Sequence, residues 1–308
     1  MARLSANAPH MPYHIDTNNS TLAMKRVMII ALALATVCSG ARAQPKVNGR
    51  APNREKRGYD KRIVVDTAKV RVLYALNAKN IKDENTYLDL GKLEVGKQMR
   101  KYSSEFVYTS DIEIAKWKRE RGYKGYVPKT FFIRGEKTDD WSELVYSDYF
   151  IQGNKLTEWA CMPLWAEKDN GRYTEDWPLM HWELRDSTKT ILSHKCQMAT
   201  CHFRGRDFVA WFAADVPIKG GPWKFGGLPG CILKVHDTRF YYKWEAVAIE
   251  RGTFPICQYP ESLYPKTSRK RIWKLQKEYT ENYLNAIGWI SLEGRIPKRI
   301  IYEQLEKE

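Results

Sequence analysis

The chain has 308 residues, of which 43% are hydrophobic and 13% aromatic, and its formal net charge is +15. This composition excludes an intrinsically disordered protein, because such chains hold too few aromatic residues to bury a core. The 19 glycines and 14 prolines are scattered without a period, which excludes collagen-like and low-complexity chains. A single apolar run approaches the length of a membrane span, so a polytopic membrane protein is excluded as well. The sequence therefore predicts a basic globular protein with one large domain or two modest ones.

The N-terminal region contains the three parts of a secretory signal peptide. Two cations at 25–26 precede an apolar run at 27–37, and a small-x-small cleavage site follows at 41–43. The run is shorter than the roughly 20 residues that a membrane-spanning helix needs. We therefore expect a signal peptide at 24–43 and export to the periplasm or outer-membrane periphery of a Gram-negative cell. A short buried N-terminal helix is the alternative.

The segments around the signal peptide are expected to have simpler roles. Residues 1–23 are an upstream extension, since Met24 is a natural initiator at the start of the signal peptide. A lipid anchor on Cys38 is the alternative processing route, although a branched valine precedes it where lipoprotein signals generally have Gly or Ala. Residues 44–61 are polar, basic and contain proline and glycine, which predicts a flexible leader. Residues 62–308 are expected to form a single β-rich domain.

The predicted elements of this domain are mostly strands, rich in β-branched and aromatic residues. A short charged helix at 111–121 interrupts them. Turn residues at intervals of about ten favour an antiparallel meander over alternating strands and helices in the second half. Strands are expected at 62–76, as a pair within 86–108, at 130–133 and 143–151, and near 179–184, 189–194, 203–213, 231–235 and 240–249.

The last predicted element is an amphipathic helix at 266–287. Its apolar stripe at helical spacing consists of Ile272, Leu275, Tyr279, Tyr283 and Ile287. The predicted fold class is therefore mainly β: a strongly curved antiparallel sheet or open half-barrel. The C-terminal helix covers this sheet or plugs its concave side, because its apolar face must be buried somewhere.

A glycine-rich loop, Gly-Gly-Pro-Trp-Lys-Phe-Gly-Gly-Leu-Pro-Gly-Cys-Ile at 220–232, is the most specific motif. Its proline fixes one φ angle and its last glycine is free to take a positive φ, which predicts a tight turn. Its two aromatic side chains lie on one side of an extended segment and either pack into a core or line a binding groove. It lacks the lysine and following helix of a phosphate loop. The candidate binding residues are Trp223, Phe225, Gly227, Leu228, Pro229 and Gly230.

This loop resembles the signature of the GLPGLI family of bacterial envelope proteins, with Cys231 where the name-giving motif has leucine. Ordered blocks at 182–189 and 196–218 extend the resemblance, which is dense over 180–237 and weaker over 62–308. The resemblance implies an envelope protein. It implies no biochemical activity and assigns no residue a role.

The cysteines after the signal peptide would meet an oxidising compartment. We expect Cys196 and Cys201 to form a disulfide across a local turn. The resemblance places an apolar residue at position 231, so Cys231 is expected to be a buried, unpaired thiol. A bridge between Cys161 and Cys257 is a further option.

No catalytic motif is present, and no cofactor is predicted. His194 and His202 flank the two adjacent cysteines, which leaves a metal or thiol centre formed with Cys196 and Cys201 as an alternative.

The cationic residues form two groups that could hold an anion. Six cations lie at 266–277, in the N-terminal half of the predicted helix. The helix dipole is positive at this end and disfavours cations, so helix stability does not explain their position. No nucleic-acid recognition motif accompanies them, so a nucleic-acid partner is not expected. The candidate anion-binding residues are Arg204, Arg206, Arg269, Lys270 and Arg271.

The leading functional hypothesis is a non-enzymatic envelope protein. It would bind an apolar or amphipathic ligand, or a protein or lipid surface of the outer membrane. The two alternatives are a metal- or thiol-dependent envelope enzyme and a scaffold for an envelope complex.

Overall fold

The structure is a computed structural model, and it describes residues 62–122, 147–162, 164–281 and 304–307. By contacts the chain divides into the units Met1–Gln44 and Pro45–Glu308, and every described residue lies in the second. The expected extension (1–23), signal peptide (24–43), leader (44–61) and strand at 130–133 all lie outside the described residues.

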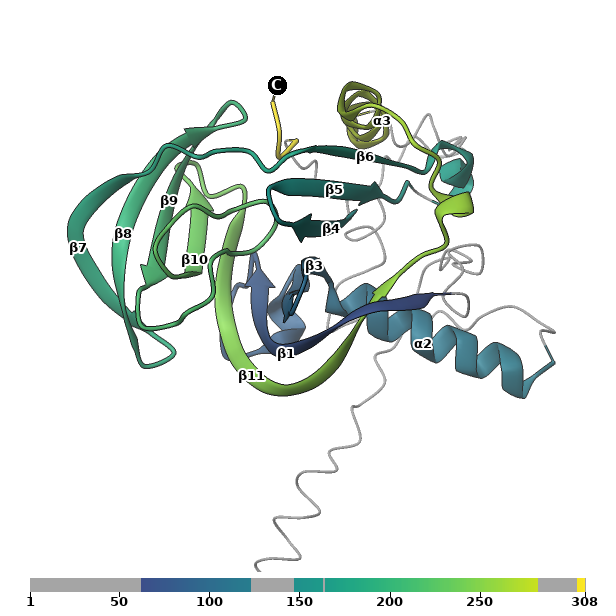
Figure 1. Cartoon of the computed structure of the whole chain (residues 1–308), viewed down its shortest axis with the longest axis horizontal. Helices are drawn as coiled ribbons and strands as arrows, with labels where there is room; N and C mark the ends of the chain where they lie inside the picture. The colour runs from purple at the N-terminus through teal and green to yellow at the C-terminus, as the bar shows by residue number, and fades with distance from the viewer. Residues whose placement is uncertain (1–61, 123–146, 163, 282–303, 308) are drawn as a thin grey trace, which may run out of the picture. The chain divides into compact units, whose positions relative to one another are not determined.

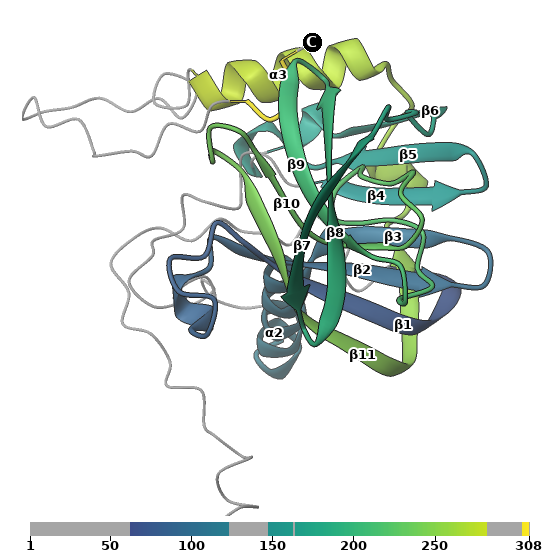
Figure 2. The ribbon, with the colours of Figure 1, turned by 90° about the vertical axis from the view of Figure 1, so that its left-hand side faces the viewer.

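The described residues form one antiparallel sheet of 11 strands, in the order β6-β5-β4-β3-β2-β1-β11-β10-β9-β8-β7 (Figure 1 and Figure 2). Two meanders meet at its centre, where the long strands β1 and β11 pair with each other. The strands are β1 (Ile63–Leu76), β2 (Asp89–Gly96), β3 (Arg100–Ser104), β4 (Ser147–Gln152), β5 (Lys155–Ala160), β6 (Gly171–Asp176), β7 (Glu183–Ile191), β8 (His194–Phe203), β9 (Arg206–Ala213), β10 (Cys231–Asp237) and β11 (Lys243–Gln258).

The mainly β class and the antiparallel arrangement are confirmed, but the predicted strong curvature is wrong. The sheet is not closed, since β6 and β7 are its two edges, and it is not strongly curled. One core cluster contains residues of β1–β4 and of β7–β11, together with the aromatic residues of the glycine-rich loop. These side chains form one apolar core that is shared by the two halves of the sheet.

The helix α2 (Glu105–Glu120) begins earlier than the predicted helix at 111–121, within the region expected to be a strand. The hydroxyl of Ser104 accepts a hydrogen bond from the backbone N–H of Val107 (3.1 Å), which is the contact of an N-capping residue. Phe106, in the first turn, packs with Tyr87 and Leu90. The cap and this apolar contact therefore end β3 and start the helix.

The helix α3 (Arg269–Glu281) confirms the predicted C-terminal helix and lies against the β6 side of the sheet (Figure 2). Its buried residues Ile272 and Tyr279 pack with Tyr173 of β6. The predicted stripe continues to Tyr283 and Ile287, which lie outside the described residues.

Three short 3-10 helices complete the described elements: η3 (Glu84–Thr86), η6 (Leu164–Asp169) and η7 (Glu261–Leu263). Among the described residues, no helix is long and apolar enough to cross a membrane.

Candidate functional site

The glycine-rich loop between β9 and β10 is folded onto itself by its own backbone. The N–H of Gly221 donates to the carbonyl of Phe225 (3.0 Å), and the N–H of Phe225 donates to the carbonyl of Pro222 (3.1 Å). The N–H of Ile232 donates to the carbonyl of Gly220 (2.9 Å), and this hydrogen bond joins the beginning of the loop to the start of β10. The loop is therefore a fixed part of the domain core.

The two aromatic residues of the loop are buried in the centre of an aromatic cluster. The ring of Phe225 lies 4.8 Å from that of Phe208 and 5.1 Å from that of Trp223. Trp223 also stacks on Trp244 of β11 at 6.4 Å. These aromatic residues therefore pack the core and are not available to line a surface groove. Of the six predicted binding residues, those exposed to solvent are Gly227 and Pro229.

Gly230 makes the turn that the motif predicts. Its φ is +155°, and a Cβ built at this position would lie 2.1 Å from the carbonyl oxygen of Ala213. No side chain fits at this distance, so the last glycine of the motif is required by close contact between two backbones.

Two tryptophans from the connection between β6 and β7 hold the outer side of the loop. The indole N–H of Trp177 donates to the carbonyl of Lys224 (3.0 Å), and that of Trp182 donates to the carbonyl of Gly226 (2.7 Å). The loop is thus fixed from both sides, by the aromatic core and by these indoles.

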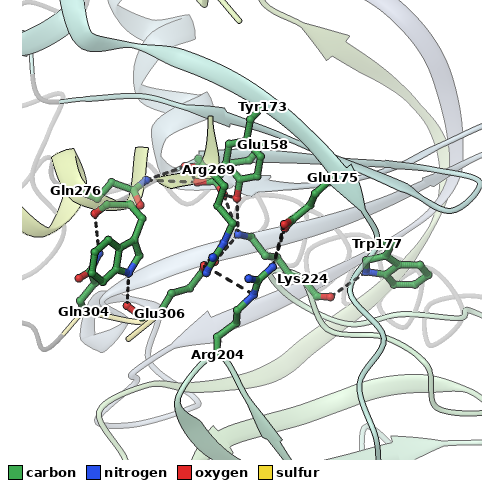
Figure 3. Close-up of polar contacts among 12 residues, drawn as sticks. Glu158, Tyr173, Glu175, Trp177, Arg204, Lys224, Arg269, Gln276, Gln304 and Glu306 are labelled. Carbon is green, nitrogen blue, oxygen red and sulfur yellow. Dashed lines mark hydrogen bonds and ion pairs between the residues drawn. The ribbon is translucent and has the colours of Figure 1, made fainter. Parts of the chain in front are cut away.

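The fully buried side chain of Lys224 points from the loop into an ionic centre (Figure 3). Its Nζ lies 2.8 Å from Oε2 of Glu158 on β5 and forms a second ion pair with Glu306. It also donates a hydrogen bond to the hydroxyl of Tyr173 (2.9 Å), which in turn donates to Glu158 (2.6 Å). Burial lowers the pKa of Lys224, but Glu158 and Glu306 raise it more, so it lies above its ordinary value and the ammonium stays charged.

Glu306 belongs to a short segment, residues 304–307, which we call the 304–307 segment. Besides Lys224, its carboxylate accepts hydrogen bonds from Arg269 of α3, the Nε bond measuring 3.0 Å. Its backbone carbonyl accepts the indole N–H of Trp273 (2.9 Å). Burial raises the pKa of Glu306, but Lys224 and Arg269 lower it more, so it lies below its ordinary value.

Two arginines of the β8–β9 hairpin hold the backbone of the same segment. Arg206 donates to the carbonyls of Leu305 (2.9 Å) and Gln304 (2.6 Å), and also pairs with Asp237 (3.2 Å). Arg204 binds both carboxylate oxygens of Glu175 at 3.0 Å, and its own carbonyl accepts the N–H of Lys307.

The structure thus brings together three of the five predicted anion-binding residues, Arg204, Arg206 and Arg269, around the 304–307 segment. The anion that Arg269 binds is a carboxylate of the same chain, Glu306. Lys270 and Arg271 are exposed, and Arg271 pairs with Asp169.

The predicted disulfide between Cys196 and Cys201 is not found, and the described residues contain no disulfide. Both cysteines lie in the uninterrupted strand β8, where the expected turn is absent. At about 3.3 Å per residue their Cα atoms are roughly 16 Å apart, far beyond the about 7 Å that a disulfide allows. Cys161 and Cys257 also form no bridge.

Cys231 is buried and unpaired, as predicted. The hydroxyl of Tyr74 lies 3.6 Å from its Sγ, and burial raises its pKa to about 11. Burial also raises the pKa of Cys201, to about 12, and that of Cys196. These three thiols are therefore protonated at neutral pH and are poor nucleophiles.

The two histidines near the cysteines have separate carboxylate partners. Nδ1 of His194 lies 2.7 Å from Asp215, and Nδ1 of His202 lies 2.7 Å from Asp207. In the part of the chain that the structure describes, no three His, Cys, Asp or Glu residues are grouped so that they could hold a metal.

Sequence reasoning missed the partners of Lys224. The available signal was a lysine between two aromatic residues in a loop expected to be packed, because a buried ammonium needs carboxylates nearby. The sequence does not show which of its 36 acidic residues supply them.

The close contact at Gly230 gives a first prediction. We expect Gly230→Ala to destabilise the domain by about 3 kcal/mol, since its methyl group would overlap the backbone of Ala213. The matched control is Gly153→Ala, where φ is +57° and no atom lies within 4 Å, so only the backbone strain of about 1 kcal/mol remains. Urea unfolding measures both, and equal losses would contradict the steric explanation.

The ionic centre gives a second prediction. We expect Lys224→Met to cost about 3–5 kcal/mol, because it leaves the carboxylates of Glu158 and Glu306 buried without their shared cation. The control is Lys219→Met, an exposed position in the same loop region, with a change within about 0.5 kcal/mol. If the two variants unfold at the same urea concentration, Lys224 does not hold the centre together.

The thiols give a third prediction. At pH 8 we expect iodoacetamide to label the half-buried Cys257 of the native protein first. Cys196, Cys201 and Cys231 should react only after denaturation, because they are buried and protonated. Peptide mapping by mass spectrometry identifies the labelled sites. Rapid native labelling of Cys231 would contradict its buried position.

Comparison with known proteins gives a family match over a short stretch of the chain and a weak structural similarity. The family model described as "Protein of unknown function (Porph_ging)" matches residues 202–234. A search of curated proteins finds no significant match. Two crystal structures of PNGF-II, in different space groups, are similar with TM-scores of 0.41 and identities of 14% and 13%. The aligned region is 68% of this chain but only 34% and 33% of those chains, and a likeness of this extent assigns no fold or activity. The matched family is the GLPGLI family, and the match covers the end of β8, β9, the glycine-rich loop and the first half of β10.

Proposed function

We propose that residues 62–308 form a domain of the GLPGLI type, that the protein is exported to the cell envelope, and that it binds an envelope partner without catalysis. The match at 202–234 and the sequence blocks around it support the family. The composition of residues 24–43 supports export. The observation that carries the binding role is the exposed edge strand β7.

The two edges of the sheet differ. The edge strand β6 is covered at its start, because Arg172 accepts a backbone hydrogen bond from Thr267 (2.8 Å) and donates one to Pro265 (3.0 Å). The edge strand β7 pairs only with β8 among the described residues, and residues 183–188 are all exposed. Uncovered strand edges of this kind bind extended segments of partner proteins.

The β7–β8 turn determines which backbone groups a partner would meet. Leu192 and Ser193 have positive φ angles of 48° and 67°, as in a two-residue type I′ hairpin. In such a hairpin the flanking residues Ile191 and His194 exchange both hydrogen bonds, and the next residue directs its N–H and C=O outward. The outward groups nearest the turn are therefore those of Thr190.

Exposed leucines lie at the other end of this edge. Leu184 in β7 is 53% exposed, and Leu179 just before the strand is 76% exposed. A partner strand with alternating apolar and polar residues would match the leucines and the polar side chains along β7. This edge therefore fits an amphipathic segment of an outer-membrane partner.

The charged groups of the candidate site support a non-catalytic role. Lys224 is 0% exposed, and the carboxylates and hydroxyl around it are held by direct contacts. A substrate would have to displace the loop or the 304–307 segment before it reached these groups.

The edge gives a fourth prediction. We expect Thr190→Pro to remove an outward N–H and abolish partner binding, while the β7–β8 ladder remains intact. Thr190→Val keeps the N–H and should bind normally. A photo-crosslinking amino acid at Leu184, in cells of the native host, reports binding as one adduct of defined mass.

The adduct should form in the parent and Thr190→Val proteins and disappear with Thr190→Pro. Thermal unfolding midpoints of the two variants must agree within about 3 °C, which confirms that both are folded. An adduct unchanged by Thr190→Pro, or no adduct in any variant, would overturn the proposed role of this edge.

A further inference from the structure

We infer that the 304–307 segment occupies a peptide-binding site in the domain, and that this site accepts an extended acidic peptide of the Leu-Glu type in trans. The site is separate from β7 and does not depend on the function proposed for that edge. It consists of the glycine-rich loop, the β8–β9 hairpin and the start of α3. Figure 3 shows Lys224, Arg204 and Arg269 of this site. Arg206 and Trp273 also belong to it.

The first argument is how the segment is held. Residues 304–307 belong to no strand or helix, so they add no ladder to the sheet. Their backbone is bound by groups of the domain: Arg206 donates to two carbonyls, Trp273 donates to a third, and the carbonyl of Arg204 accepts the N–H of Lys307. Contacts to the main chain do not depend on which sequence is bound, as is usual where an extended peptide is recognised.

The second argument is that two side chains of the segment are recognised. Leu305 packs against the main core cluster, and the carboxylate of Glu306 lies between Lys224 and Arg269. Gln304 also reaches out, and its side-chain amide donates to the carbonyl of Trp273 (3.0 Å). An apolar residue followed by glutamate is thus the sequence that the site selects.

The third argument is charge. Within the centre, the cations Lys224, Arg204 and Arg269 face the carboxylates of Glu158, Glu175 and Glu306. Without Glu306, three cations would face two carboxylates, and an ammonium with 0% exposure would lose one of its two ion pairs. The vacant site would therefore attract a carboxylate more strongly than a neutral side chain.

The experiment uses a chain that ends at residue 303 and a fluorescent peptide of residues 304–308 (Gln-Leu-Glu-Lys-Glu). We expect the peptide to bind this chain and to raise its thermal midpoint by at least about 3 °C. A peptide with Glu306→Gln should bind at least about tenfold more weakly. The full-length chain should bind the parent peptide at least about tenfold more weakly than the shortened chain does, because its own segment competes for the site. If the shortened chain shows a cooperative thermal transition, and is therefore folded, no binding at millimolar peptide or equal binding of both peptides would overturn the inference.

A second variant keeps the test decisive if the shortened chain does not fold. The full-length chain with Leu305→Ala and Glu306→Gln retains the segment but weakens its hold on the site. It should bind the labelled parent peptide at least about tenfold more tightly than the parent chain does. Equal binding by the two chains would overturn the inference.

Mixing identifies the source of the peptide. If full-length chain and shortened chain form a one-to-one complex by light scattering, a second copy can supply the segment. If the synthetic peptide binds but the mixed chains stay separate, the ligand is a Leu-Glu segment of a different protein. Both results support the site and differ only in the donor. The β7 variants report on the other edge of the sheet, so this test and the test of the proposed function can fail independently.

Discussion

The burial of one ammonium group, that of Lys224, is the constraint on which the centre of this protein depends. Removing a lysine from water costs several kcal/mol unless carboxylates replace the solvent. Here the carboxylates are those of Glu158 on β5 and of Glu306. The buried charge therefore links the glycine-rich loop, the β4–β5 hairpin and the 304–307 segment. If the lysine and its two carboxylate partners were all replaced by well-packed apolar side chains, the core would be held as firmly, as replacements of whole buried ion pairs have shown elsewhere. The lysine therefore contributes a unique arrangement of these three parts rather than extra stability.

The same centre explains why the net charge says little about partners in this protein. A charge of +15 points to an external anion when the sequence is considered alone. In the structure, Arg204, Arg206 and Arg269 bind carboxylates and carbonyl groups of their own chain. Arginine suits this internal use because its fork of donors can bind two acceptors at once, as Arg206 does with Leu305 and Gln304.

The sequence was sufficient for the features that depend on local patterns and insufficient for those that depend on distant ones. The antiparallel strands, α3 and the buried Cys231 follow from apolar spacing, turn residues and motif position. The predicted disulfide between Cys196 and Cys201 is wrong because it required a turn between them. Residues 197–200, Gln-Met-Ala-Thr, include no residue that favours a turn, and the strand β8 continues through them. The early start of α2 depended on the Ser104 cap, a signal present in the sequence but outweighed by the strand-like alternation around it. The carboxylate partners of Lys224 depend on tertiary structure alone, which no local pattern encodes.

The pairing of β1 with β11 joins residues that are far apart in the sequence, from Ile63 opposite Gln258 to Leu76 opposite Trp244. Contacts of such large sequence separation form slowly, because a long loop must close before any of them is made. The meander from β1 to β6 can assemble early, yet its β1 edge stays uncovered until the sixteen residues of β11 are in place. During that interval the partly folded chain exposes a long strand edge with alternating valines, a surface on which copies of the chain can aggregate. The order of folding therefore makes the completion of β11 the step that protects this protein from self-association.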